Sequence, residues 1–257
     1  MIECYCLASS SAGNCFLFRF VPNDKDSKEK ASTLMIEAGI PYKEILKKCN
    51  SIGFDFSTIN DCLITHAHSD HSKSAIDVEN HMIRIYTSRH TIEACGLNKA
   101  LCIKSGDSFE TSDKIKVTCF SVVHDCEGSL GFYIEKGEDS AIFINDCYKV
   151  DFSLMCFKPK LVLIECNHDD KTTHICYENA LKEGDLFEIK RYERILKSHL
   201  GVYGCKKVLL HIDLTECKSI ILLHLSDRNA NEYKMKEEIQ RFTDIRTYVA
   251  GKNGGIK

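Results

Sequence analysis

The chain has 257 residues, a net charge of −3 and 44% hydrophobic residues, which is the composition of a globular protein. No run approaches ~18 consecutive apolar residues, so the sequence predicts no membrane span, and its start lacks the basic and apolar regions of a secretory signal. The slightly acidic balance disfavours a protein that coats nucleic acid through its net charge, although a local basic patch stays open.

Fifteen cysteines are an odd number, and no two CxxC motifs stand at a zinc-ribbon spacing. Cys62, Cys119, Cys147 and Cys166 lie in or beside apolar runs, where a free thiol behaves as a small hydrophobic group. Without a visible signal for secretion, a disulfide framework is not expected. The sequence therefore indicates a reduced, cytoplasmic protein.

No repeat, low-complexity segment or Gly/Ser-rich linker divides the chain, so residues 1–257 are expected to form a single domain. The first half alternates short apolar runs with turn residues, which predicts strands at 1–8, 14–20, 32–37, 61–65 and 84–87. A charged hairpin tip is expected at 22–31. Helices are expected at 42–49, from residue 73 onward, and at 90–95.

In the second half, strands are expected at 114–121, 130–135, 140–144, 161–165, 219–223 and 246–250. Helices are expected at 174–199, 206–215 and 231–242. Strands thus come in clusters with helices between the clusters, and strand ends repeatedly deliver His, Asp or Glu. This order predicts an α/β protein with two sheets, helices outside them and a polar site at one rim.

The segment Thr65-His66-Ala67-His68-Ser69-Asp70-His71 follows directly on an apolar strand. Three histidines and an aspartate within six residues are costly to explain by packing, since both residue types are poor core formers. On an extended segment, His66 and His68 point the same way, and Asp70 and His71 can then turn toward a second centre. Imidazole and carboxylate are the ligands expected for zinc and similar divalent ions.

H-x-H-x-D-H resembles the hallmark of metallo-β-lactamase-fold hydrolases, which are αββα sandwiches. The resemblance implies that His66, His68 and His124 hold one metal ion, that Asp70, His71 and His224 hold a second, and that Asp146 bridges the two. It also implies a supporting role for Glu37, which stands where the family usually has Asp and lies outside the ligand set. Zinc is the expected ion, with manganese as an alternative.

Two such ions roughly 3.5–4 Å apart share a water and lower its pKa toward neutrality, and they neutralise charge on a phosphoryl or acyl oxygen. The resemblance therefore implies an enzyme that attacks its substrate with metal-bound hydroxide. Asp70 and Asp146 are the expected catalytic residues. Asp70 is placed to orient the bridging water and to shuttle a proton.

Six further segments point to one subgroup among the proteins of this fold. They are LASSSAGN, MIEAGIPYKEI, THAHSDHSK, VVHDCEGSLGF, LIECNHDD and LLHLSDRNANE. Together they are similar to the YycJ/WalJ-like nucleases and their phage-encoded relatives. Those relatives include the anti-Pycsar proteins, which hydrolyse cyclic mononucleotide signals of bacterial immunity. One segment differs from the YycJ-like pattern. Those proteins have a glycine-histidine-x-serine-asparagine stretch where this chain has SHLGVYG around His199.

The first hypothesis is a two-zinc phosphodiesterase of 3′,5′-cyclic mononucleotides (cyclic CMP, UMP, AMP and GMP), active in phage-type evasion of Pycsar immunity. The resemblance also suggests a homodimer, with residues 174–215 as the contact. The alternative is a DNA or RNA nuclease that uses the same metals, and a third hypothesis is a non-catalytic nucleotide-binding protein. Polymer nucleases usually add a basic arm, whereas the best basic cluster here, Lys190 to Lys197, is interrupted by acids and predicts a solvated helix face.

Two segments are candidates for substrate contacts. Ser10, Ser11 and Asn14 belong to a tight polar turn whose N–H and hydroxyl groups can approach a phosphate, although a plain structural turn is an equal reading. Asn167 and His168 follow Glu165 at a strand end, where other site residues are expected. They are candidates for substrate binding or for support of the metal ligands.

Overall fold

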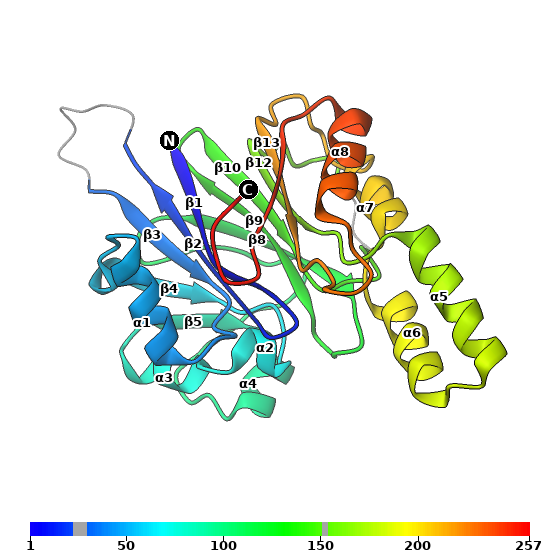
Figure 1. The fold of residues 1–257 in the computed structure, drawn as a ribbon. Helices are drawn as coiled ribbons and strands as arrows, with labels where there is room; N and C mark the ends of the chain where they lie inside the picture. Colours follow the sequence, from blue (N-terminus) through cyan, green and yellow to red (C-terminus); the bar gives the residue numbers. More distant parts are fainter. Residues whose placement is uncertain (23–29, 151–153) are drawn as a thin grey trace.

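The computed structural model describes residues 1–22, 30–150 and 154–257. Two β-sheets lie face to face with helices on both outer sides (Figure 1). The first sheet has the strand order β1-β2-β3-β4-β5-β6, and the second has the order β11-β8-β9-β10-β12-β13-β14 with β7 paired to β8. This is the predicted arrangement of two sheets between helical layers.

The strands of the first sheet are β1 (Ile2–Ser10), β2 (Gly13–Phe20), β3 (Ser32–Ile36), β4 (Ile59–Leu63), β5 (Arg84–Thr87) and β6 (Leu101–Cys102). Those of the second are β7 (Ser108–Glu110), β8 (Lys116–Val123), β9 (Leu130–Lys136), β10 (Asp139–Ile144), β11 (Lys149–Val150), β12 (Leu161–Glu165), β13 (Ser219–Leu223) and β14 (Thr247–Val249). The helices are α1 (Tyr42–Ser51), α2 (Ser69–Ser72), α3 (Ala75–Asn80), α4 (Arg89–Cys95), α5 (Asp170–Glu183), α6 (Leu186–Ser198), α7 (Val202–Leu209) and α8 (Glu232–Thr243), with a 3₁₀ turn at Phe56–Thr58.

Three apolar clusters hold these layers together. The central one joins both sheets, with Phe16 of β2 against Phe143 of β10 in an edge-on contact 5.4 Å between ring centres. A second cluster packs the outer face of the second sheet on α7 and α8, and a third packs the first sheet on α1 and α3. Each sheet is therefore buried on both faces, which explains why several strands are continuous apolar runs.

Most predicted elements are present, with ends shifted by a few residues. The short strands β6, β7 and β11 were not predicted, because two or three residues are too few for a periodic pattern. The predicted helix at 174–199 is two helices, divided where Gly184 takes a left-handed conformation (φ +71°). Most of the predicted hairpin tip, residues 23–29, lies outside the described residues.

The helix expected at 206–215 is wrong in its bounds, since α7 begins at Val202 and ends at Leu209. The carboxylate of Asp213 accepts hydrogen bonds from the backbone N–H and the hydroxyl of Thr215, and this local turn competes with the helix. The cysteine prediction is confirmed for Cys62, Cys119, Cys147 and Cys166, which are all buried in apolar clusters. None of the helices in the described ranges combines the length and the apolar character that a membrane crossing requires.

Candidate metal centre

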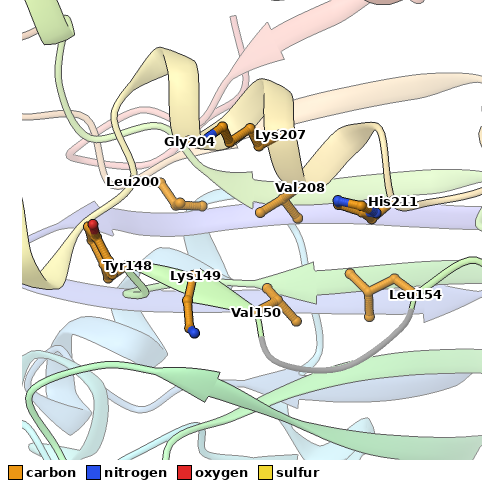
Figure 2. A pocket seen from close by; sticks show the side chains of 9 residues that line it. All are labelled: Tyr148, Lys149, Val150, Leu154, Leu200, Gly204, Lys207, Val208 and His211. Carbon is orange, nitrogen blue, oxygen red and sulfur yellow. The ribbon is translucent and has the colours of Figure 1, made fainter.

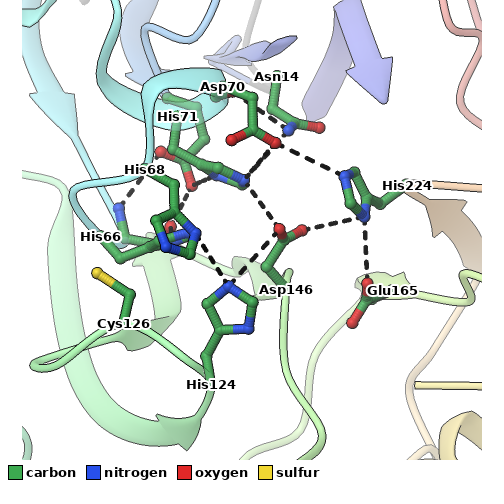
Figure 3. A network of polar contacts seen from close by, with 12 residues as sticks. Asn14, His66, His68, Asp70, His71, His124, Cys126, Asp146, Glu165 and His224 are labelled. Carbon is green, nitrogen blue, oxygen red and sulfur yellow. Dashed lines mark hydrogen bonds and ion pairs between the residues drawn. The ribbon is translucent and has the colours of Figure 1, made fainter. Parts of the chain in front are cut away.

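The predicted metal ligands converge at one rim of the sandwich, where strands of both sheets end (Figure 3). The segment from His66 to His71 follows β4, and His124 follows β8. Asp146 follows β10, and His224 follows β13. Ligand atoms that are far apart in the sequence are thereby brought within 4.8 Å of one another, in three overlapping groups of residues.

The first group is His66, His68 and His124. Nδ1 of His124 lies 3.0 Å from the carbonyl oxygen of Ser198 and donates to it, which leaves Nε2 for an ion. That Nε2 lies 3.3 Å from Nδ1 of His68. Two ligands of one tetrahedral zinc stand roughly 3.3 Å apart, given zinc–nitrogen distances of about 2.0–2.1 Å. The spacing therefore suits two ligands of a single ion.

The other two groups share Asp146: one is His66, His71 and Asp146, and the other is Asp146, Glu165, His199 and His224. Nε2 of His71 lies 3.2 Å from one carboxylate oxygen of Asp146 and 3.5 Å from Asp70. Nδ1 of His224 lies 3.2 Å from Asp146 and 3.2 Å from Glu165, so its Nε2 is the nitrogen left for an ion. Asp146 is thus in reach of the ligands of both expected ions.

The donor set fits metal ions because its buried atoms lack good partners within the chain. Nε2 of His66 is buried and has no hydrogen-bond or ion-pair partner among the described residues. Nε2 of His224 and Oδ1 of Asp146 are buried without a hydrogen bond and have only ion-pair contacts, to Asp70 at 3.8 Å and to Nδ1 of His224 at 3.2 Å. An unpaired buried polar atom costs about 1–3 kcal/mol. Bound cations would satisfy these atoms.

Electrostatics point the same way. Burial alone would raise the pKa of Asp70, but its polar contacts with the rings of His224 and His71 outweigh burial and hold this pKa well below its usual range. Burial would lower the pKa of His224, but Asp146, Asp70 and Glu165 raise it to about 10. Burial, followed by the charge of His71, lowers the pKa of His66. The buried carboxylates thus attract positive charge, which protons supply in the metal-free chain and which metal ions would supply on binding.

Three residues of the site have an unusual backbone. Glu37, Asp146 and His224 have φ values of +66°, +44° and +56°, and they are three of the six non-glycine residues with positive φ in the described ranges. Such conformations cost energy and persist only when the surrounding structure enforces them. Each stands just past the end of its strand, so the strain turns its side chain toward the rim.

Glu37 contacts the predicted ligand loop at Thr65 and His71. It is fully buried, and its carboxylate accepts a 2.5 Å hydrogen bond from the hydroxyl of Thr65. It also lies 3.0 Å from Nδ1 of His71, which orients the other nitrogen of that ring toward Asp146 and Asp70. The chain packs closely here, because a Cβ at Gly39 would collide with the carbonyl group of Asp70.

Two of the residues predicted to contact the substrate, Asn14 and Asn167, instead contact predicted metal ligands. Asn14 is buried, and its amide nitrogen lies 3.2 Å from Nε2 of His71. The amide of Asn167 donates to the carbonyl of His224 at 2.8 Å. These two asparagines therefore brace metal ligands.

Ser10 and Ser11 do not contact the ligand set directly. The Ser10 hydroxyl instead accepts a hydrogen bond from the backbone of Ala12, whereas Ser11 is exposed in the turn. His168 is buried with an unpartnered Nδ1, and its backbone carbonyl accepts from Val202. Among the described residues, no hydrogen bond joins His168 to a predicted metal ligand.

Sequence reasoning missed three residues that contact the predicted ligands: Glu165, Ser9 and Asp125. Glu165 lies between two histidines, accepting from His199 at 2.6 Å and lying 3.2 Å from His224. The hydroxyl of Ser9, one residue before the predicted turn serines, accepts from the backbone N–H of His224 at 2.9 Å. Asp125 lies 3.0 Å from Nε2 of His124. Asp125 could have been found from the sequence because it stands next to the predicted ligand His124. Glu165 could have been found because it stands at the end of a predicted strand.

Comparisons with known proteins find relatives in sequence and in structure, although no protein-family model matches the chain. It is similar to exodeoxyribonuclease WalJ of Streptococcus pneumoniae serotype 2 (strain D39), with 25% identity over 237 residues that cover 87% of this chain and 81% of WalJ.

Two solved structures agree over the whole chain at 14% identity. One is the metallo-β-lactamase fold protein YhfI of Bacillus subtilis, with a TM-score of 0.70, covering 100% of this chain and 98% of YhfI. The other is Zn²⁺-bound PqqB of Methylobacterium extorquens, with a TM-score of 0.67 and 99% coverage of both chains. The chain thus has the metallo-β-lactamase fold, and residues that could hold metal ions gather at its rim.

Proposed function

We propose that the protein is a two-metal phosphodiesterase that hydrolyses 3′,5′-cyclic mononucleotides, with zinc as the expected ion. The observation that carries the two-metal assignment is the convergence of ligand atoms around the unpartnered Nε2 of His66 and the carboxylate of Asp146. These atoms come from His66, His68, His71, His124, Asp146 and His224, and Asp70 lies 3.5 Å from His71. We propose that in a phage-infected cell this activity removes a cyclic nucleotide signal.

When bound, the two ions supply an activated water and neutralise charge on the phosphoryl group. Asp70 lies 3.5 Å from Nε2 of His71 and 3.8 Å from Nε2 of His224, which places its carboxylate to help hold an ion and to orient that water. On the other side of Asp146, Nδ1 of His199 donates to Glu165, so Nε2 is the nitrogen left to deliver a proton. The His199 ring centre lies 5.6 Å from that of His124 and 5.2 Å from that of His224. This position suits protonation of the leaving alkoxide.

A small substrate is favoured by the pairing of basic side chains near the centre. Arg194 of α6 donates to Asp125 at 3.0 Å, beside the ligand His124. Arg191 and Arg228 are both paired with Glu188. Arginines engaged by neighbouring acids offer little free charge for the successive phosphates of a polymer, which supports the prediction that the α6 cluster is a solvated face.

The second candidate is a nuclease, and the similarity to the exodeoxyribonuclease WalJ favours it. A substrate comparison at two salt concentrations separates the two functions. With metal-loaded protein, we expect 3′,5′-cyclic CMP, UMP, AMP or GMP to be opened to the monophosphate, with short DNA and RNA left intact. We also expect the rate to change little with salt, because one phosphate releases few counterions. Cleaved oligonucleotides with untouched cyclic nucleotides, and a rate that falls steeply with salt, would establish the nuclease instead.

The assignment of His199 as proton donor predicts a dependence on the leaving group. We expect His199→Ala to lower kcat for a cyclic nucleotide about 10²- to 10⁴-fold, the usual range for a general acid. The loss should be much smaller for a p-nitrophenyl phosphodiester, whose leaving group departs without a proton. His174→Ala, which changes an exposed histidine on α5, is the matched control. An equal loss of kcat on both substrates would remove the proton-donor role.

We also propose that the protein is a homodimer joined through the helical hairpin of α5 and α6, which projects from the body in Figure 1. Leu186 and Phe187 at the start of α6 are 71% and 75% exposed, which is unusual for neighbouring large apolar side chains. Sedimentation equilibrium should give a mass of twice 29.2 kDa. The double variant Leu186→Ser, Phe187→Ser should then sediment as a monomer, whereas a monomeric parent protein would contradict the proposal.

A further inference from the structure

The metal centre is open to solvent at one edge. The side chains of His68 and Asp125 are 32% and 38% exposed, whereas those of His71, His124 and Asp146 are at most 3% exposed. A substrate that reaches the metal ions therefore approaches past His68 and Asp125. A charged side chain beside these two residues lies where it can contact that substrate.

Arg194 of α6 lies at this open edge. Its Nε donates to Oδ2 of Asp125 at 3.0 Å, and the other oxygen of the same carboxylate lies 3.0 Å from Nε2 of His124, the nitrogen left for a metal ion. A single carboxylate therefore separates the guanidinium group from a ligand atom of the metal centre. The side chain of Arg194 is 63% exposed, so a ligand can approach it from solvent.

The end of α6 holds this position independently of the side-chain pair. The carbonyl oxygen of Ser198 accepts a hydrogen bond from Nδ1 of His124 at 3.0 Å, and the Ser198 hydroxyl donates to the carbonyl of Arg194 at 2.8 Å. The next residue, His199, donates to Glu165 at 2.6 Å. The end of α6 is thus attached to the metal centre at two points, and Arg194 lies about one turn before them.

The pairing with Asp125 leaves most of the guanidinium group available. Arginine carries five N–H donors, and a phosphate can accept two of them side by side. Among the described residues, the hydrogen bond and the ion pair of Arg194 use Nε alone, so its two terminal nitrogens remain for a ligand. Arg191, three residues earlier, differs because two of its nitrogens already donate to Glu188.

A second pair of cations has no comparable link to the metal ligands. A cavity between residues 148–150 and α7 has Lys149 and Lys207 among its lining residues (Figure 2). None of the described residues that line it is a predicted metal ligand, and Nζ of Lys207 lies 4.4 Å from the ring centre of Tyr203. Arg194 is therefore the better placed cation for a group bound at the metal ions.

We propose that Arg194 binds the phosphate of the substrate, with its two terminal nitrogens donating to phosphoryl oxygens of the group that the metal ions hold. The inference rests on the proposed function and deepens it, because it assigns a residue outside the ligand set that recognises the phosphodiester. Asp125 positions the guanidinium group through Nε. One arginine suits a substrate with one phosphate, in keeping with the pairing of the other α6 arginine, Arg191, with Glu188.

Inorganic phosphate tests this anion site without turnover. It would be titrated by calorimetry into zinc-loaded protein from which excess zinc has been removed. We expect Arg194→Gln, which removes the charge, to bind phosphate at least tenfold more weakly than the parent protein, and Arg194→Lys to lie between the two. Arg241→Gln is the matched control, because Arg241 is an exposed arginine on α8 that donates to Glu237 at 2.9 Å. Zinc per chain, measured by atomic emission, should be the same in all four proteins.

Kinetics of the metal-loaded enzyme supply the second measurement. Arg194→Gln should raise KM for the cyclic nucleotide about tenfold with a smaller change in kcat, because the lost contact holds the phosphate before and during the reaction. Guanidinium ions in solution should lower the raised KM of Arg194→Ala, which a merely structural role of the side chain would not explain.

Three results would overturn the anion site even if the phosphodiesterase is active: no phosphate binding by the parent protein, equal phosphate binding by Arg194→Gln, or loss of zinc from Arg194→Gln. Phosphate binding that depends on Arg194, in a protein inactive on every phosphodiester, would support the site and refute the proposed function.

Discussion

Replacing Asp146 by asparagine should abolish turnover while leaving the fold intact. Asp146 is the carboxylate in reach of both ligand groups, and asparagine keeps its shape but lacks the charge that bridges two cations. Metal ions contribute several kcal/mol of charge stabilisation in the transition state, and each ~1.4 kcal/mol is a factor of ten. We therefore expect kcat to fall about 10³-fold or more, together with a loss of bound zinc measured by atomic emission.

The backbone makes this variant informative. Asp146 has a φ of +44°, a conformation that asparagine adopts more readily than most residues, so the substitution adds no strain. Asp244→Asn is the matched control, because Asp244 has a φ of +57° at the end of α8, away from the metal ligands. Unchanged circular dichroism in both variants would show that the fold is kept. An Asp146→Asn protein that retains full activity would remove Asp146 from the chemistry.

Zinc should stabilise the protein strongly. The centre gathers buried carboxylates and unpartnered histidine nitrogens, so cations bind the folded chain in preference to the unfolded one. At a free zinc concentration of 100 times Kd, one site adds about 2.7 kcal/mol. A chain of this size gains about 2–4 °C in Tm per kcal/mol, which predicts a rise of roughly 5–10 °C by calorimetry relative to chelator-treated protein.

Magnesium is the control for a general ionic effect. It prefers oxygen ligands in octahedral geometry and dehydrates reluctantly, whereas five of the seven expected ligands are histidines, so magnesium should raise Tm far less. Asp146→Asn should also show a smaller rise with zinc. An equal rise in this variant would mean that zinc binds elsewhere, for example at exposed thiols such as Cys102 or Cys156.

The residues of the candidate metal centre could be located from the sequence because four of the predicted ligands stand in one short segment after an apolar strand. Their conformation is then local: β4 ends at Leu63, and the backbone turns into the short helix α2 within a few residues. His124, Asp146 and His224 each follow an apolar strand as well. Since strand ends of the two sheets meet at one rim, a His or Asp in that position is readily assigned to the site.

The pair of Glu165 and His199 shows where sequence reasoning fails. These residues are 34 positions apart and meet only because α5 and α6 fold back toward β12. The contact depends on tertiary packing, which neither residue's neighbours reveal. The same holds for Ser9 against His224, which are 215 residues apart. Side chains that support a ligand act through contacts of this kind, whereas the ligands themselves can be recognised by type and spacing.

A zinc titration with activity as the readout tests the central claim most directly. Chelator-treated protein would receive increasing zinc, and the conversion of a 3′,5′-cyclic nucleotide to its monophosphate would be followed by ³¹P NMR. A two-metal phosphodiesterase is inactive at the start and reaches full activity when about two ions per chain are bound, one at His66, His68 and His124 and one beside Asp146 and His224. Undiminished hydrolysis by the chelator-treated protein, or zinc binding at both groups without hydrolysis of any phosphodiester, would contradict it.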